Sequence, residues 1–223
     1  MVQAVGEILP MAVGVAISPV PIVAIVLVLG TPLARTNGPA FAVGWLLGLS
    51  AAGAVTLMVT SEGSREGGDQ PTWVTALSLV VGLLFVLIAV RTWRSRPRGG
   101  DDAGLPSWMH AVDRFTTGKS LAAGLVLSAV NPKNLALTIA AAVSIAAAGV
   151  STGEDLGTLA VFVLLGSVSI LAPVAIYFAM GERAVSILGG IKNWLAAHSA
   201  AITTVLLLVI GAKLIGDGLG GLS

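Results

Sequence analysis

Six long apolar stretches constrain the fold of this chain more than any other feature of its sequence. They cover residues 5–30, 39–60, 73–92, 118–148, 157–180 and 197–219. About 20 consecutive apolar residues are enough for a helix to cross the hydrocarbon core of a bilayer. Only 10% of the residues are charged, whereas a soluble domain carries about a quarter. We therefore predict an all-α integral membrane protein with six transmembrane helices.

The polar composition excludes several classes of function. Lys and Arg nearly balance Asp and Glu, with a formal net charge of +1, so we expect no nucleic-acid partner. The chain has no cysteine, and its two histidines, His110 and His198, are far apart, so we expect no metal site and no cofactor. No span carries a nucleophile, a base and an orienting group together, which argues against an enzyme.

A polar segment, residues 93–117, separates a first half, residues 1–92, from a second half, residues 118–223. Most cations lie in this linker and in the loops near Arg35 and Lys192. Because short cytoplasmic loops are enriched in Lys and Arg, we predict a multi-pass plasma-membrane protein with a cytoplasmic linker and two extracytoplasmic termini.

A basic run closes the third apolar stretch and continues into the linker. Its residues are Arg91, Arg94, Arg96 and Arg98. Such a run usually sets the topology and attracts anionic lipid headgroups. A role in binding a partner protein is the alternative.

The two halves share an unusual break in their first apolar stretch. The segment Ala16–Ile22, with Pro19 and Pro21, aligns with Ala129–Leu135, which contains Pro132. Each half has three predicted spans, so the second half enters the membrane from the opposite side. The sequence thus predicts two inverted three-helix repeats, an arrangement found in secondary transporters with binding sites between the repeats. The alternative is a six-helix protein with two unrelated proline kinks.

Both breaks have the chemistry of a helix that starts inside the membrane. Ser and Asn are good N-caps, and proline is favoured at the first helical position. A helix N-terminus attracts anions, and a lysine stands beside the second one. We therefore predict a central electropositive site for a carboxylate, sulfate or phosphate group. The residues predicted to bind the substrate are Ser18, Pro19, Pro21, Asn131, Pro132, Lys133 and Asn134.

Three further residues are candidates for coupling or gating. Lys213 and Asp217 are ionisable groups in the last span, where such groups are often functional, although an i,i+4 ion pair is the simpler interpretation. Pro173 in the fifth span is either a hinge or a fixed kink. Gly44 and Gly48 form a GxxxG pair that favours close helix packing and also offers a contact face for a homodimer.

The chain resembles the LysE-type translocator superfamily, and within it the actinobacterial GAP family of sulfolipid- and glycopeptidolipid-addressing proteins. The resemblance is carried by Ser18-Pro19-Val20-Pro21, by Asn131-Pro132-Lys133-Asn134 and by the segment Gly211–Gly218. It implies a six-span exporter whose two proline motifs line the central site. It also implies a role in moving cell-envelope glycolipids, or their precursors, across the plasma membrane.

These observations leave three hypotheses for the function. The first is a secondary transporter or flippase-like exporter of an anionic envelope lipid or its precursor. The second is an exporter of amino acids or other small amphiphiles. The third is a non-transporting accessory protein that assists the proteins of envelope lipid synthesis or export, with the basic run as its best support.

Overall fold

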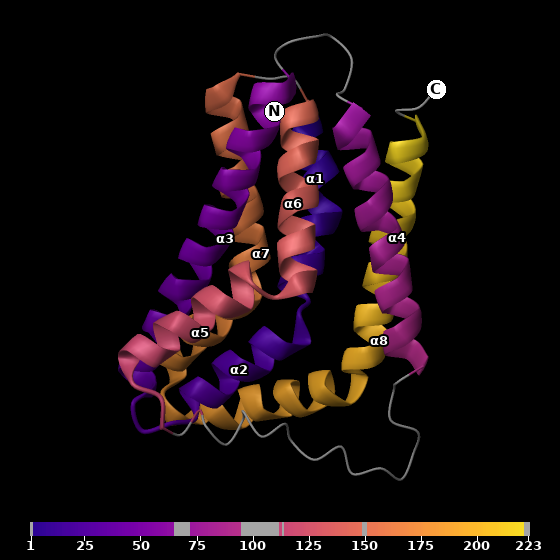
Figure 1. The fold of residues 1–223 in the computed structure, drawn as a ribbon. Helices are drawn as coiled ribbons and strands as arrows, with labels where there is room; N and C mark the ends of the chain where they lie inside the picture. The colour runs from indigo at the N-terminus through magenta and orange to yellow at the C-terminus, as the bar shows by residue number, and fades with distance from the viewer. Residues whose placement is uncertain (1, 65–71, 95–111, 113, 149–150, 221–223) are drawn as a thin grey trace.

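The computed structural model describes residues 2–64, 72–94, 112, 114–148 and 151–220. Its regular structure in these ranges is helical throughout (Figure 1). The helices are α1 (Val2–Ala16), α2 (Pro19–Leu29), α3 (Ala34–Ser64), α4 (Thr72–Arg94), α5 (Thr117–Ala129), α6 (Pro132–Ala147), α7 (Thr152–Met180) and α8 (Glu182–Gly220). The all-α prediction is therefore confirmed, while most of the predicted linker, residues 93–117, falls outside the described ranges.

Two of the predicted spans are bent pairs of helices. The angle between α1 and α2 is 52°, and that between α5 and α6 is 58°. Both bends occur where a proline begins the second helix of the pair, because proline lacks the N–H that would continue the first. Within the described residues, three helices are long and apolar enough to cross a membrane, or up to five if each bent pair is one span. The third predicted span, residues 73–92, lies in α4, which has 23 residues.

The helices run alternately between the two ends of the molecule (Figure 1). The pair α1–α2 descends from the end that holds both termini, α3 returns, and α4 descends again. The pair α5–α6 then ascends, α7 descends, and α8 returns beside α4. The lower half-helices α2 and α5 thus lie below the breaks, and the upper half-helices α1 and α6 lie above them.

The loop predicted near Lys192 is instead the first part of helix α8, which also contains Arg183. It begins immediately after α7, and its first part lies flat across the lower end of the molecule before it turns upward (Figure 1). Gly181, with a φ of 60°, separates the two helices. A positive φ is readily accessible only to glycine, so this residue permits the sharp change of direction.

Glycines bring neighbouring helices close together at two interfaces. On α3, the predicted packing pair Gly44 and Gly48 faces α5, and a Cβ on Gly44 would overlap the Leu121 carbonyl. Gly124 of α5 faces α3 in return, and its Cβ would overlap the Phe41 carbonyl. The GxxxG pair therefore packs inside this chain, so a homodimer would need another face. A second close approach joins α4 and α8.

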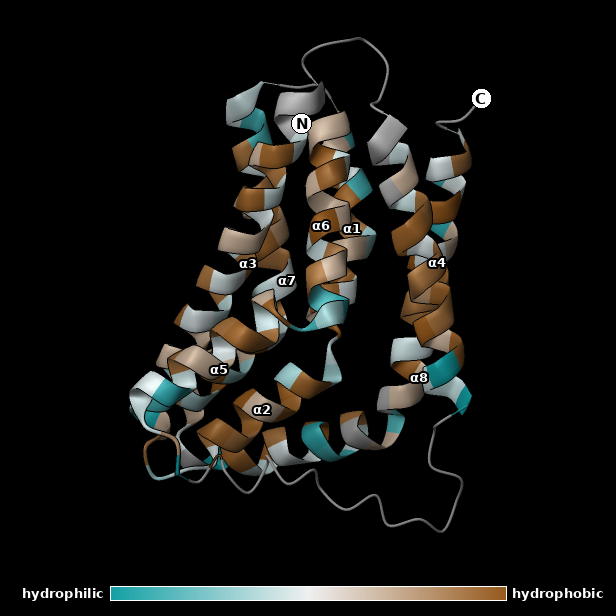
Figure 2. Cartoon of the chain, in the orientation of Figure 1, coloured by the Kyte–Doolittle hydropathy of each residue, from teal (hydrophilic) through white to brown (hydrophobic). Residues whose placement is uncertain are grey.

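The outer surface of the helices is strongly apolar. Figure 2 shows hydrophobic residues along the helical columns and hydrophilic residues mainly toward their ends. Met58 is 66% exposed and Val80 is 64% exposed, and many other large apolar side chains also face outward. In water such a surface would be an aggregation liability, whereas in a bilayer it is solvated by lipid. The protein is therefore embedded in a membrane.

The contact between α3 and α5 predicts different effects for two Gly→Ala substitutions on α5. Gly124→Ala should destabilise the fold by at least about 2 kcal/mol, because the new methyl group meets backbone that cannot give way. Gly118→Ala is the matched control, since nothing lies within 4 Å of its added Cβ. Melting temperatures of the purified proteins in detergent measure the difference. Equal melting temperatures for the two variants would contradict the close approach.

Candidate functional site

The first break leaves the carbonyl oxygen of Ile17, the residue after α1, without a helical donor. Ser18 is the buried N-cap of α2, with an extended backbone (φ −98°, ψ 105°), and its side chain makes no capping hydrogen bond. Pro19 begins the helix, and Pro21 follows it. In a continuous helix the Ile17 carbonyl would accept from the N–H of residue 21, which proline lacks. The Ile17 oxygen must therefore find a partner elsewhere.

The second break is capped by its own side chains. Asn131 is the N-cap of α6, and its Oδ1 accepts a hydrogen bond of 3.1 Å from the backbone N–H of Lys133. Pro132 occupies the first helical position, where its missing N–H costs nothing. The sequence-based interpretation of Asn131 and Pro132 as a helix start is confirmed.

The buried amide of Asn134 caps the C-terminal end of α5. The Asn131 N–H donates to the carbonyl of Val126 at 3.2 Å. In a continuous helix it would donate to the Leu127 carbonyl, which therefore lacks this donor. The Nδ2 group of Asn134 donates to that carbonyl at 2.9 Å. The Asn134 side chain is completely buried, and its Oδ1 has no hydrogen-bond partner. One buried acceptor beside the second break thus has no partner within the described residues.

Lys133 connects the two breaks. Its Nζ donates a hydrogen bond of 3.3 Å to the carbonyl oxygen of Ile17, the oxygen that Pro21 leaves without a donor. The contact joins the start of α6 to the end of α1, and these two helices pack side by side. A cation at the C-terminal end of a helix is also favoured by the helix dipole. Figure 2 shows the hydrophilic colour at the foot of α6, between hydrophobic columns.

The polar side chains of this site come almost entirely from the second half. In the alignment of the two breaks, the corresponding residues are Ser18 with Asn131, Val20 with Lys133, and Pro21 with Asn134. The first half therefore has no counterpart of the lysine amine or of the asparagine amide that caps a carbonyl. The second half supplies a donor to each break.

The helix ends at the two breaks carry partial charges of both signs. The N-termini of α2 and α6 meet the C-termini of α1 and α5 there, so positive and negative helix ends alternate. The half-buried Lys133 lies in the first turn of α6 and donates to the Ile17 carbonyl at the end of α1. An ammonium group has three N–H donors and Ile17 accepts one of them, so an anionic group could still accept from the others.

The remaining candidates lie outside the two breaks. The Nζ of Lys213 and the Oδ2 of Asp217 form an i,i+4 ion pair of 2.6 Å on α8, with side chains 31% and 51% exposed. The simpler interpretation of this pair is therefore confirmed. Pro173 is buried within α7, which continues through it as a helix.

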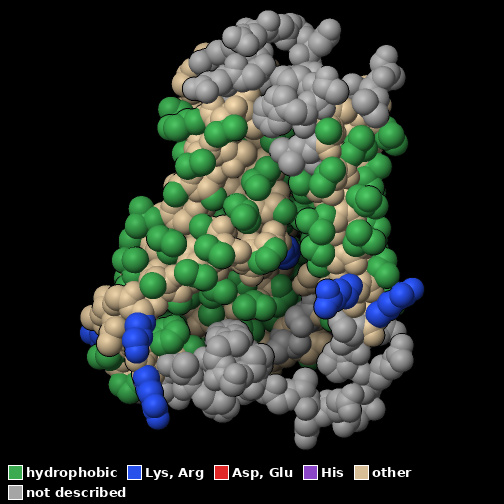
Figure 3. Space-filling view, viewed as in Figure 1, with side chains coloured by type: hydrophobic (Ala, Val, Ile, Leu, Met, Phe, Trp, Pro, Cys, Tyr) green, Lys and Arg blue, Asp and Glu red, His purple; other side chains and the backbone are tan. Residues whose placement is uncertain are grey.

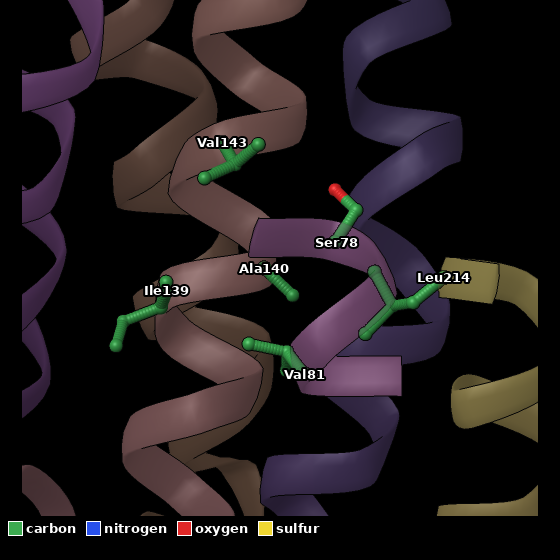
Figure 4. Close-up of a pocket in the computed structure, with 6 residues that line it drawn as sticks. All are labelled: Ser78, Val81, Ile139, Ala140, Val143 and Leu214. Carbon is green, nitrogen blue, oxygen red and sulfur yellow. The ribbon is translucent and has the colours of Figure 1, made fainter. Parts of the chain in front are cut away.

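A small cavity marks the contact between α6 and the α4–α8 pair. Figure 4 shows the side chains of these three helices around it. The lining residues are Ser78, Val81, Ile139, Ala140, Val143 and Leu214. Its volume is about 10 Å³, about the space of one water molecule, and its lining is apolar apart from Ser78. None of the three pockets described for this structure is lined by a residue of either break.

Two backbone acceptors of the site were missed by the sequence interpretation, the carbonyls of Ile17 and Leu127. The first could have been found, because a proline removes the donor for the carbonyl four residues before it, and Pro21 stands four residues after Ile17. The second had no such signal, because the redirected Asn131 N–H is a feature of the folded turn.

The bond from Asn134 to Leu127 predicts a large stability effect for a small change. Asn134→Leu keeps the number and branching of the side-chain heavy atoms but leaves the Leu127 carbonyl without a donor, so we expect a loss of about 1–2 kcal/mol. Thr138→Val is the matched control, because the buried Thr138 hydroxyl donates only to the Asn134 carbonyl, an acceptor within the same helix. Thermal unfolding in detergent should rank Asn134→Leu below Thr138→Val, and the reverse order would refute the capping role.

A comparison with known families finds a match that covers nearly the whole chain. The family described as "Sap, sulfolipid-1-addressing protein" matches residues 8–220, a range that includes both breaks and all eight helices in whole or in part. Comparisons with curated proteins and with solved structures gave no match. The match to the family is long enough to assign membership, and the chain belongs to the sulfolipid-1-addressing protein family.

Proposed function

We propose that the protein is a six-span membrane transporter built from two inverted three-helix repeats, of the LysE translocator type. The contacts between helices support the repeat, because they recur when the halves are exchanged. Helix α3 packs on α5 as α7 packs on α1, and α3 packs on α6 as α7 packs on α2. Inverted repeats place their binding site near mid-membrane, between the two halves, where the breaks lie.

The orientation follows from the distribution of cations. Figure 3 shows Lys and Arg side chains at the lower end of the molecule, and this end carries the exposed residues Arg35, Arg91 and Arg183. In the plasma membrane the lower end then faces the cytoplasm, and both termini face away from it.

The substrate class is an anionic envelope lipid or its precursor. The description of the family names a sulfolipid, and a sulfated lipid carries a negative charge. The observation that carries the proposal is the Lys133 amine at the junction of the two breaks, with N–H groups beyond the one bound to Ile17. Such a group binds a sulfate, phosphate or carboxylate head, while the apolar outer surface of the helices accommodates lipid tails.

The mechanism is a rocking of one repeat against the other around the breaks. The Lys133–Ile17 bond is one contact between the two repeats in this conformation, beside the larger α3–α5 and α4–α8 interfaces. An anionic headgroup competes with the Ile17 carbonyl for the amine and weakens this connection. Binding of the substrate thereby favours the alternative conformation. We assign no coupling step to Lys213 or Asp217, which pair with each other.

Transport in liposomes tests this function. We expect the purified protein to accelerate the exchange of fluorescently labelled phosphatidylglycerol between leaflets, measured by dithionite quenching, more than that of labelled phosphatidylcholine. Lys133→Met keeps most of the apolar stem but removes the charge, and should slow this exchange about tenfold or more. Lys119→Met removes an exposed cation from α5 and should leave the exchange unchanged. If the protein accelerates the exchange of none of the labelled lipids, the lipid-transport proposal is wrong.

The same preparation separates the two competing functions. An exporter of amino acids or other small amphiphiles would exchange labelled amino acids across the liposome membrane and would leave the labelled lipids in place. An accessory protein would exchange neither, and in cells it would lose function on substitution of Arg96 and Arg98 while tolerating Lys133→Met. The transporter proposal requires the opposite ranking of these variants.

A further inference from the structure

A groove lies between α4 and α8 near the end of the molecule that carries the cations. Its part between the two helices is a pocket of about 300 Å³, and an adjoining pocket of about 470 Å³, lined by α4 alone, shares Val90 and Arg94 with it. The two helices are antiparallel here and close together, and the buried Thr204 of α8 donates to the Ala89 carbonyl of α4 at 3.5 Å. Its hydroxyl is thus already engaged within the protein, and the charged groups that line the groove are the guanidinium groups of Arg91 and Arg94.

The walls of the groove are apolar side chains that face outward from both helices. Leu87 is 60% exposed, Val205 is 59% exposed, and Leu208 is 40% exposed. On α4 the lining spans about two turns, from Leu87 to Arg94, and both helices run along the direction that an acyl chain takes in a bilayer. An apolar groove of this kind accommodates a hydrocarbon chain.

Two exposed cations stand at the end of the groove. Arg91 and Arg94 are one turn apart on the last turn of α4, and both line the groove. None of the described carboxylates forms an ion pair with either residue. A guanidinium group offers a planar fork of N–H donors that suits the oxygens of a phosphate. The groove therefore combines apolar walls with two guanidinium groups that no carboxylate in the described part of the chain pairs.

We propose that this groove binds an anionic glycerophospholipid, with its phosphate on Arg91 and Arg94 and an acyl chain between α4 and α8. Charge complementarity selects this occupant. A zwitterionic lipid also fills the apolar part, but its own cation opposes the two arginines. A second copy of the chain, docked through the same face, would bring its own Arg91 and Arg94 toward this pair. The site is separate from the two breaks and does not depend on transport.

Lipid binding to the purified full chain, counted by native mass spectrometry, tests the charge requirement. We expect phosphatidylglycerol to bind about tenfold more tightly than phosphatidylcholine with the same acyl chains, because each interfacial arginine contributes favourably with an anionic headgroup. Arg91→Gln combined with Arg94→Gln should abolish this preference. The matched control, Arg35→Gln combined with Arg114→Gln, removes two exposed cations elsewhere and should retain it.

A second pair of variants tests the position of the acyl chain. Leu208→Trp fills the groove and should reduce phosphatidylglycerol binding about as much as the double arginine substitution. Val209→Trp adds the same bulk at an outward-facing position that does not line the groove, and should bind normally. Equal binding of the two lipids by the unmodified protein would overturn the proposal. Equal loss in the Arg35/Arg114 control, or a change of oligomeric state in place of lipid binding, would overturn it too.

Discussion

The structure depends on one constraint: a helix broken inside hydrocarbon exposes backbone groups that water cannot reach. Each such group costs several kcal/mol if it stays unpaired. Proline starts the second helix at both breaks, and the carbonyls of Ile17 and Leu127 are left to be satisfied by side chains. Lys133 and Asn134 donate the hydrogen bonds that these two carbonyls need. The junction of the two halves is thereby determined by backbone hydrogen bonding as well as by apolar packing.

Close helix packing holds the broken helices in position. A half-helix presents only a short surface to its neighbours, so α5 needs an intimate contact to stay in place. Gly44, Gly48 and Gly124 provide it, because they leave no side chain between the backbones of α3 and α5. The large side chains of Phe41 and Trp45 are fully buried beside this contact. The α3–α5 pair then presents the second break to the end of α1.

Much of this architecture could be predicted from the sequence because its signals are local. Apolar length predicts the helices, Pro19 and Pro132 predict where two of them start, and a four-residue spacing predicts the Lys213–Asp217 pair. The partner of Lys133 could not be predicted, because the sequence shows which carbonyl Pro21 frees but not which side chain reaches it. The flat first part of α8 was missed for a similar reason. Its position depends on the turn at Gly181 and on packing against α2, neither of which appears in the hydropathy of the segment.

The unequal division of polar groups between the breaks limits how the two halves can be recombined. A symmetric assembly of two copies of residues 1–92 would contain two Ile17 carbonyls and no lysine amine to pair with them, since Val20 stands where the second half has Lys133. A symmetric assembly of two second halves would have the reverse imbalance, with two amines and no proline-freed oxygen of this kind. Each half thus supplies a group that the other lacks, so the pairing of Lys133 with Ile17 requires one half of each kind.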